Sequence, residues 1–218
     1  MAIAAVSVIE RAGFRVVVPQ ENLCCGRPLY DQGMLSRARR NLNRIIAVLA
    51  PYAQRGVPII GLEPSCILTF RDELPGLFPH NDDARALAAV ALTFGEFIAR
   101  HAPVITPPPA VDRVLLHGHC HQKSLAGLDS EIAVLRRRRD LRLEVPDAGC
   151  CGMAGAFGYA PEHYEISRMI GERVLIPAIL KSQFNTAIVA DGFACRTQIR
   201  QFCPGRTPYH LAQLLNDV

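Results

Sequence analysis

The sequence predicts an α/β fold made of two tandem, pseudo-symmetric units, each a small parallel sheet flanked by helices. Short apolar strands alternate with stretches whose apolar residues recur at helical spacing, which is typical of parallel sheets covered by helices. The same order of elements occurs twice, and each copy contains the tripeptide Cys-Cys-Gly. A repeat of both element order and cysteine position is a stronger indication than any single motif.

The second copy shows the complete order of elements. In chain order these are a strand VDRVLLHG ending near Cys120, a helix over 122–140, a strand LRLEVP, the doublet Cys150-Cys151, a helix over 161–180, a strand NTAIVADG, and a helical stretch opened by Cys195. Each cysteine of this copy therefore follows a predicted strand.

The first copy repeats this order from its middle. Its elements are a helix through AIAAVSVIERAG, a strand FRVVVP, the doublet Cys24-Cys25, a helix over 35–52, a strand VPIIGLE, and Cys66. The last cysteine follows the doublet at a similar distance in both copies, 41 residues in the first and 44 in the second. When the doublets are aligned, the counterpart of Cys120 falls before Met1. We therefore expect the first unit to lack its N-terminal strand and the cysteine that follows it.

This repeat predicts a first module over residues 1–100, a stiff proline-rich linker over 101–111, and a second module over 112–218. We expect three or more strands in each module. Ligands of such sheets lie beyond the carboxyl ends of the strands, and the repeated cysteines all fall there. We therefore expect one site in each module.

Composition argues against several classes of protein. No apolar run approaches the roughly 20 residues that span a bilayer, and the first residues lack the pattern of a secretory signal. We expect a cytoplasmic protein, in which eight cysteines indicate metal binding or redox chemistry. The net charge of +4 is scattered, and the run 136–139 of four arginines is interpreted as a solvated helix end. We expect no nucleic-acid partner.

The repeated cysteines are interpreted as ligands of a soft metal centre. Iron–sulfur clusters are normally held by four cysteines, and the second copy supplies Cys120, Cys150, Cys151 and Cys195. Gly26 and Gly152 would let the backbone approach inorganic sulfur. Packing alone explains the doublets poorly, because adjacent residues leaving a strand point in opposite directions. Cys203 has no counterpart in the other copy and is interpreted as a free thiol.

A zinc site is the main alternative. His117, His119 and His121 alternate with other residues in the segment HGHCHQ, and histidine is a common zinc ligand. The first copy has no histidine beside its doublet or its last cysteine, which favours iron and sulfur. His119 and His121 are interpreted as neighbours of the cluster, as alternative ligands, or as proton carriers. A third hypothesis is thiol catalysis by a cysteine that one of these histidines activates.

Nothing in the sequence predicts substrate chemistry in this chain. Glu63 and Glu96 are interpreted as a strand-end hydrogen-bond acceptor and a helix surface charge, so no catalytic residue is assigned. No Gly-x-Gly-x-x-Gly motif follows a strand, which argues against a flavin or nicotinamide site. We expect the isolated chain to bind no FAD and to oxidise no hydroxy acid.

With both doublets in view, the chain resembles the cysteine-rich, Cys-Cys-Gly (CCG) domain family. The resemblance lies in the segments LCCGRPLYDQGML, GLEPSC, HGHCHQKSL, GCCGMAGAFGY and HLAQLL. The family includes the B subunit of heterodisulfide reductase, the iron–sulfur subunits of glycolate oxidase and anaerobic glycerol-3-phosphate dehydrogenase, and lactate-utilisation proteins. The chain is most similar to the C-terminal part of large FAD-linked oxidases of D-lactate or D-2-hydroxyglutarate type.

This resemblance implies that an FAD domain or subunit outside the chain oxidises a 2-hydroxy acid and passes electrons through cysteine-ligated clusters. Quinone or a soluble carrier would be the acceptor, and such partners would hold the chain at the inner face of the membrane. By position, Cys24, Cys25 and Cys66 would serve a first site, and the four cysteines of the second copy would hold an ordinary [4Fe-4S] cluster.

The chain departs from the fullest family motif in one respect. That motif ends in Cys-x-x-Cys. In this chain the first of these two cysteines is replaced, by Glu63 before Cys66 and by Gly192 before Cys195. One thiolate is therefore missing from each module. This argues against the non-cubane cluster and the disulfide-cleaving chemistry of heterodisulfide reductase.

Overall fold

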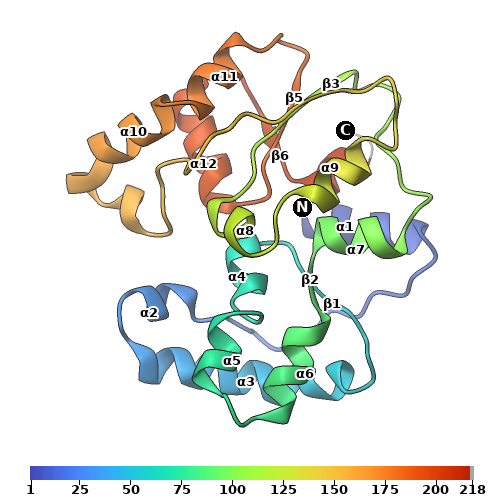
Figure 1. The fold of residues 1–218 in the computed structure, drawn as a ribbon, viewed down its shortest axis with the longest axis vertical. Helices are drawn as coiled ribbons and strands as arrows, with labels where there is room; N and C mark the ends of the chain where they lie inside the picture. The colour runs from blue at the N-terminus through green and yellow to red at the C-terminus, as the bar shows by residue number, and fades with distance from the viewer. Residues whose placement is uncertain (217–218) are drawn as a thin grey trace.

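The computed structural model describes residues 1–216 and contains two small parallel sheets with helices around them (Figure 1). The first half of the chain comprises α1 (Ala2–Arg11), α2 (Arg27–Asp31), α3 (Leu35–Ala53), β1 (Ile59–Gly61), α4 (Pro64–Leu68), α5 (Glu73–Leu77), α6 (Asp82–Val90), β2 (Ala91–Thr93) and α7 (Phe94–His101).

The second half contains the larger sheet. It comprises β3 (Arg113–Leu116), α8 (Cys120–Leu125), α9 (Asp129–Leu135), β4 (Arg142–Glu144), the 3-10 turns η1 (Phe157–Tyr159) and η2 (Pro161–His163), α10 (Tyr164–Glu172), α11 (Leu175–Lys181), β5 (Ala187–Val189), α12 (Phe193–Phe202), β6 (Pro208–Tyr209) and α13 (Leu211–Leu215). No helix among the described residues is both long enough and apolar enough to cross a membrane.

The predicted α/β class is confirmed. The larger sheet has the order β4-β3-β5-β6, the smaller sheet pairs β1 with β2, and every pairing is parallel. The expectation of three or more strands is wrong for the first half, where the described residues form a two-stranded sheet. The helix predicted over 35–52 is present as α3.

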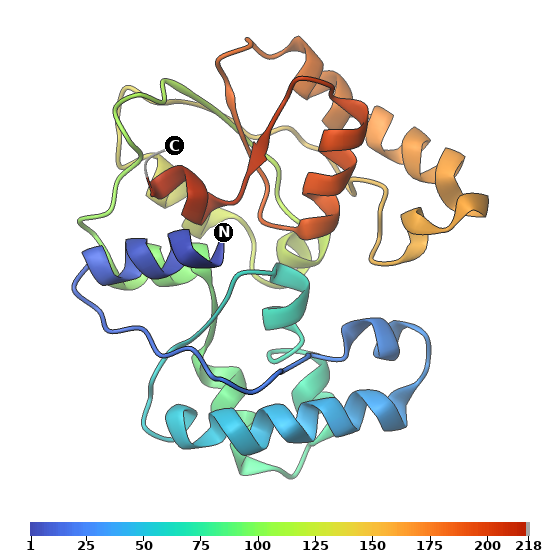
Figure 2. The same ribbon diagram turned by 180° about the vertical axis from the view of Figure 1, so that it is seen from behind.

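The predicted strand FRVVVP is also wrong. Residues 14–19 form no strand and lie in the extended segment between α1 and α2, which passes in front of the two-stranded sheet in the view of Figure 2. The side chains of Val17 and Val18 are 51% and 69% exposed. A run of β-branched residues fits a half-buried pleated surface, but this segment pairs with no strand and gains little burial. Its composition alone therefore did not make it a strand.

Two predicted helices are each divided into shorter ones. The helix expected over 122–140 is interrupted between α8 and α9 by Gly127, whose φ of +72° ends a right-handed helix. The helix expected over 161–180 consists of η2, α10 and α11, with a break at Val174, where φ is −141°. Apolar spacing predicted the buried faces of these segments but not their ends.

The repeat extends further than the cysteine pattern. After β1 the chain passes through α4 to β2 and α7, and after β5 it passes through α12 to β6 and α13. Both α7 and α13 begin with a reciprocal cap, formed by Thr93 with Glu96 and by His210 with Gln213. Glu96 is thus buried in a capping box and paired with Arg71, so its interpretation as a helix surface charge was wrong.

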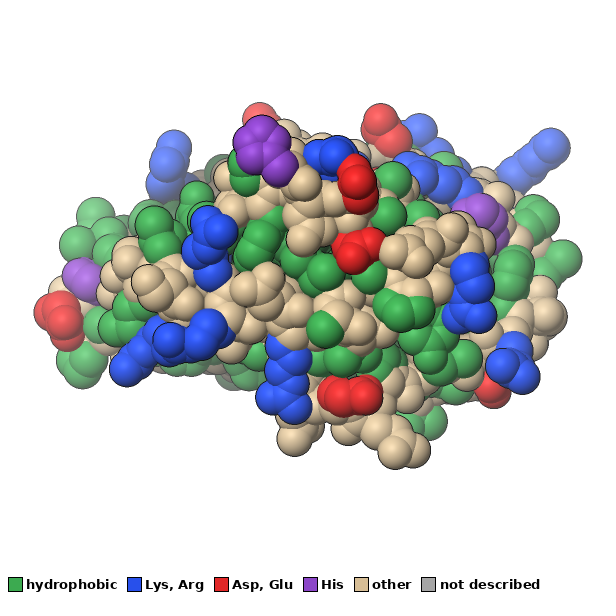
Figure 3. All heavy atoms as spheres, turned by 90° about the horizontal axis from the view of Figure 1, so that it is seen from below, with side chains coloured by type: hydrophobic (Ala, Val, Ile, Leu, Met, Phe, Trp, Pro, Cys, Tyr) green, Lys and Arg blue, Asp and Glu red, His purple; other side chains and the backbone are tan. Residues whose placement is uncertain are grey.

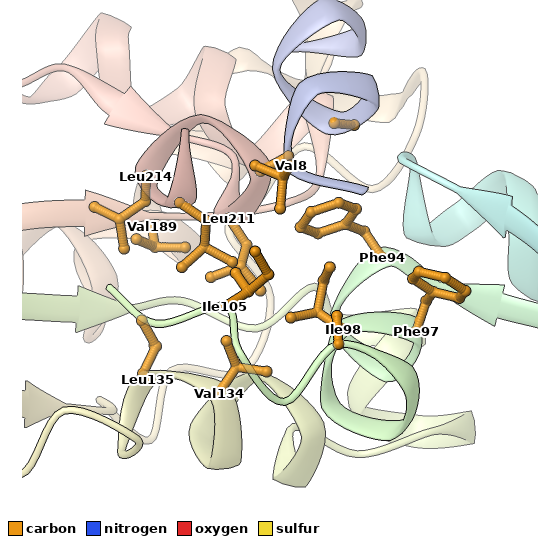
Figure 4. Packing of buried hydrophobic residues seen from close by; sticks show 14 of the residues in the cluster. Val8, Phe94, Phe97, Ile98, Ile105, Val134, Leu135, Val189, Leu211 and Leu214 are labelled. Atoms are coloured by element: carbon orange, nitrogen blue, oxygen red, sulfur yellow. The ribbon is translucent and has the colours of Figure 1, made fainter. Parts of the chain in front are cut away.

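The two halves exchange helices across one apolar core. α1 of the first half packs against α13 of the second, and α9 of the second half packs against α7 of the first. The labelled side chains in Figure 4 show this core, with Val8 near Phe94 and with Val134 and Leu135 near Ile98 and Ile105. Each half therefore stabilises the other. The module boundaries at 100 and 112 stay a prediction about the repeat and do not separate two cores.

The arginine run beside this core is partly structural. Arg137 donates hydrogen bonds at 2.7 to 3.0 Å to the carbonyl oxygens of Ile98, Ala99, Ala102 and Ile105 at the end of α7. Arg138 pairs with Asp112 and Asp140. The interpretation of the whole run as a solvated helix end was therefore wrong for these two residues.

Charged side chains of both signs are dispersed on the face seen from below. Figure 3 shows basic, acidic and apolar side chains interspersed there, with no broad region of one sign. This mixture agrees with the scattered charge expected from the sequence.

Candidate metal centre

The four cysteines of the second half meet at the carboxyl ends of β3, β4 and β5. Cys120 begins α8, Cys150 and Cys151 lie in the loop after β4, and Cys195 lies in the first turn of α12. The thiol of Cys120 contacts Cys150, and Cys151 contacts both Cys150 and Cys195. Three segments far apart in the sequence thus bring four sulfur atoms together, each in contact with the next.

A histidine joins this group. One ring nitrogen of His117 and the sulfur atoms of Cys151 and Cys195 all lie within 4.8 Å of one another. The residue is 2% exposed, and its Nε2 atom has no hydrogen-bond partner among the described residues. His117 was not among the site residues predicted from the sequence. The available signal was its position directly after the buried strand β3, which predicts burial at the sheet's carboxyl end.

The other two histidines lie at the edge of the group. His119 is the N-terminal cap residue of α8, and its ring lies so close to Gly192 that a Cβ there would be 2.5 Å from it. His121 faces the first half of the chain, where its Nε2 lies 3.2 Å from the guanidinium of Arg27. His117, rather than His119 or His121, is therefore the histidine that accompanies the pair Cys151 and Cys195.

The thiols divide into two donors and two acceptors. Hydrogen bonds from Cys120 and Cys151 lower the pKa of Cys150 well below its ordinary value, and Cys151 does the same for Cys195. The pKa values of Cys120 and Cys151 are raised, mainly by these same contacts and by burial. Two thiolates in a largely buried site favour a bound cation, because buried charge without a partner is costly.

The donor set fits a soft metal centre. It offers four sulfur atoms, one imidazole nitrogen without a hydrogen bond, and a backbone N–H from Gly152 that lies 3.3 Å from the sulfur of Cys150. Thiolate-rich sites select iron–sulfur clusters or zinc over hard cations. Backbone N–H groups directed at ligating sulfur are the kind of outer contact that tunes such centres.

Gly152 also has a steric role. Its φ is +105°, and a Cβ would lie 2.1 Å from the carbonyl oxygen of Ser167 in α10. The missing side chain therefore makes room for α10. The close approach of this helix fixes the loop that carries Cys150 and Cys151.

The cysteines of the first half form a smaller group. The sulfur atoms of Cys25 and Cys66 lie 3.2 Å apart, Cys25 is buried, and Cys24 and Cys66 are exposed. The contact between the two thiols lowers the pKa of Cys25 to about 7 and raises the pKa of Cys66. The structure thus pairs two of the three predicted residues of this site.

Contacts between the halves link the two sites. Arg27, which follows the first doublet, binds Glu73 of α5 and lies next to His121. Glu73 also forms a close group with Asp72 and His121. Glu63 accepts a hydrogen bond from the backbone N–H of Phe193, in agreement with its interpretation as a strand-end acceptor.

Comparison with known proteins identifies the cysteine pattern. Residues 1–71 match the family model described as CCG, the cysteine-rich domain. Residues 1–71 are thus similar to the CCG cysteine-rich domain. The resemblance stated from the sequence segments is therefore confirmed, and the matched range includes Cys24, Cys25 and Cys66 of the first site.

Curated relatives of the chain include three dehydrogenase or substrate-utilisation proteins. It is 25% identical to the C subunit of anaerobic glycerol-3-phosphate dehydrogenase of Escherichia coli (strain K12), over 89% of the chain and 49% of that protein. It is 28% identical to D-2-hydroxyglutarate dehydrogenase of the same strain, over 98% of the chain and 20% of that protein. It is 28% identical to lactate utilization protein A of Bacillus subtilis (strain 168), over 78% of the chain and 73% of that protein.

The chain therefore spans about half of the first relative and about a fifth of the second. Both alignments extend well beyond residue 71, because they cover most of the 218 residues. The second half of the chain, with its four-cysteine group, is thus part of the similarity to these relatives.

Proposed function

We propose that this chain is the electron-transfer part of an oxidoreductase and that Cys120, Cys150, Cys151 and Cys195 hold an iron–sulfur cluster of the [4Fe-4S] type. The convergence of these four thiols at the carboxyl ends of three parallel strands carries the proposal. A bound cluster would accept and release one electron at a time. The thiolates would supply its ligands, and the N–H of Gly152 would stabilise negative charge on Cys150.

The remaining residues of the site would control its surroundings. His117 is buried beside Cys151 and Cys195, so it would shield the centre from water on the side of the sheet. Cys120 and Cys150 are half-buried, which leaves one side of the centre near the surface. Electrons would enter or leave through that side, because an exposed edge shortens the distance to a partner.

The donor and the acceptor would be other parts of a dehydrogenase. The names of two relatives include the word dehydrogenase, and the family resemblance implies a flavin (FAD) domain or subunit as the donor. A 2-hydroxy acid would be the substrate of the whole enzyme, and quinone or a soluble carrier would be the acceptor. The chain itself would bind neither the FAD nor the substrate.

A second candidate is a zinc-stabilised module that docks to a flavoprotein. His117, Cys151 and Cys195 favour it, because their ligand atoms lie within 4.8 Å of one another. Mixed cysteine and histidine ligands are typical of structural zinc sites. In that case the metal would stabilise the fold and would carry no electrons.

The deciding experiment is the iron, acid-labile sulfide and zinc content of the chain after anaerobic purification, together with its visible spectrum. We expect iron and sulfide in the unaltered chain and their loss in Cys150→Ser and Cys151→Ser. Cys203→Ala is the matched control, because Cys203 is buried outside both groups. Zinc without sulfide would favour the second candidate, and a chain without metal under anaerobic conditions would contradict both.

A further inference from the structure

A basic pocket lies at the opposite end of the larger sheet from the cysteines. It has a volume of about 320 Å³ and is formed at the amino ends of β3, β4 and β5, whereas the four cysteines of the second half lie at the carboxyl ends. Three of the side chains that line it are cationic, Arg113, Arg142 and Lys181, and one, Glu144, is acidic. The pocket therefore has an excess of positive charge.

The two arginines of this pocket lie side by side. Arg113 is the first residue of β3 and Arg142 is the first residue of β4, and the parallel pairing of these strands places the two residues in register. Neighbouring strands are about 4.8 Å apart, so two like charges are adjacent and repel each other. A bound anion between the two guanidinium groups would remove this repulsion.

No carboxylate of the described residues neutralises this pair. The side chains of Arg113 and Arg142 form neither an ion pair nor a hydrogen bond within that part of the chain. Asp112 and Asp140, which are close to the two arginines in the sequence, both pair with Arg138 instead. The positive charge of the pocket is therefore available to a ligand.

The turn over 182–186 forms another wall of the pocket and is held in place by its own contacts. Arg206 donates hydrogen bonds to the hydroxyl of Ser182 at 2.6 Å and to the carbonyl oxygens of Ser182 and Thr186 at 3.3 Å. Thr186 follows Arg113 in the same row across the sheet, because Val114 pairs with Ala187. Thr186 is 9% exposed, and its hydroxyl has no hydrogen-bond partner among the described residues. A nearly buried hydroxyl thus lies next to the cationic pair.

We propose that this pocket binds an anion that carries a phosphate or diphosphate group. A guanidinium presents a planar set of N–H donors that matches phosphate oxygens. A phosphate monoester has roughly two negative charges near neutral pH, which suits a pocket with unpaired cations. The volume lies at the lower end of the roughly 300–1,000 Å³ that small-molecule sites occupy, so a small organic part fits as well.

The test is isothermal titration calorimetry of the full chain with inorganic pyrophosphate at low salt and again at higher salt. We expect one site per chain, with an affinity that falls as salt screens the charges. Arg113→Gln and Arg142→Gln should each weaken binding by at least about tenfold, since one hydrogen bond to a charged group is worth about that factor. Arg40→Gln is the matched control, because it removes the same charge from an exposed position on α3, far from the pocket in the sequence.

A second measurement distinguishes a free phosphorylated molecule from a lipid headgroup. The chain is sedimented with vesicles of equal parts phosphatidylcholine and phosphatidate, and with vesicles of phosphatidylcholine alone. Binding of pyrophosphate in solution would assign the pocket to a free molecule. Binding of the phosphatidate vesicles alone, with loss in Arg142→Gln, would assign it to a headgroup. The proposal is overturned if neither probe binds, or if Arg40→Gln weakens binding as much as the two pocket variants do.

Folding and metal content are checked in the same variants. Arg142 is exposed, so Arg142→Gln is expected to fold even where the variant of the half-buried Arg113 does not. Both variants should retain the iron and sulfide of the unaltered chain, because the pocket and the cysteines lie at opposite ends of the strands. Pyrophosphate binding by a chain without iron would contradict only the electron-transfer cluster, and iron in a chain that binds neither probe would contradict only the anion pocket.

Discussion

The carboxylate of Glu63 accepts a hydrogen bond of 2.7 Å from the backbone N–H of Phe193, at the start of the helix that carries Cys195. Glu63 itself lies three residues before Cys66, and its other oxygen accepts a hydrogen bond from Ser65. One side chain therefore connects the strand end of the first site to the helix start of the second. A carboxylate at a helix N-terminus also interacts favourably with the helix dipole.

Substituting Glu63 should weaken the junction between the two halves. Glu63→Ala removes a charge-assisted hydrogen bond and the dipole interaction, so we expect the free energy of unfolding to fall by about 1–2 kcal/mol. Urea denaturation of the anaerobic protein measures this change. Glu21→Ala, at an exposed loop position, is the control and should change stability by less than about 0.5 kcal/mol. Equal effects of the two variants would show that the contact does not join the halves.

Glu131 should make stability depend on pH. The residue is 1% exposed, its Oε2 atom has no hydrogen-bond partner among the described residues, and Oε1 accepts a hydrogen bond from Gln122. Burial raises its pKa to about 7, and the nearby charges of Asp191 and Glu96 add to this shift. Because the pKa is higher in the folded protein than in the unfolded chain, folding favours the protonated carboxyl. Its stabilising contribution is complete at low pH and is lost as the pH rises to about 7.

The matched variant is Glu131→Gln, which keeps an acceptor for Gln122 and cannot ionise. Relative to this variant, the unaltered chain should lose about 2–3 kcal/mol of unfolding free energy between pH 5 and pH 8, at about 1.4 kcal/mol for each unit of pKa shift. Denaturant titrations at several pH values measure the difference. A constant difference across that range would contradict a titrating Glu131.

Gly152→Ala should disrupt the second site. The substitution places a Cβ 2.1 Å from the carbonyl oxygen of Ser167 and gives a non-glycine residue a φ of +105°. We expect a loss of at least about 2 kcal/mol in stability, because both backbone strain and a steric clash oppose folding, and a lower iron content.

Gly149→Ala is the control for this glycine. It lies three residues earlier in the same loop, and a Cβ there would meet no atom within 4 Å. Iron content and thermal unfolding should stay close to those of the unaltered chain. If the two variants behave alike, the approach of α10 at Gly152 does not position the cysteine doublet.

Arg137 should contribute more to stability than its neighbour in the sequence. Its guanidinium donates to four backbone carbonyl oxygens in the last turn of α7 and the segment after it. Carbonyl groups at a helix C-terminus lack the partners that they have inside a helix. We expect Arg137→Ala to lower the free energy of unfolding by about 2–3 kcal/mol, since hydrogen bonds from a charged donor are individually worth about 1.5–3 kcal/mol and are not additive. The exposed Arg139 is the control, and Arg139→Ala should be nearly neutral in the same urea titration.

The sequence predicted the order of elements where periodicity and length agree. The helix expected over 35–52 is present as Leu35–Ala53, because its apolar residues recur along one buried face. The sequence also predicted the strands before Cys66 and Cys195, because short apolar runs bounded by turns are typical of buried parallel strands. The element order in turn predicted that the cysteines would lie at the carboxyl ends of the strands.

Pairing between distant segments was decided by the tertiary structure. FRVVVP has the composition of a strand but finds no partner edge, and α1 packs on α13 rather than within its own repeat. Similarly, only the packing of the segments after β3 and β5 shows that His117 accompanies Cys195 while Cys25 and Cys66 remain a pair. The local spacing of apolar residues predicts which face of a segment is buried. Which other segment covers that face depends on contacts between residues far apart in the sequence, and the local spacing carries no information about those contacts.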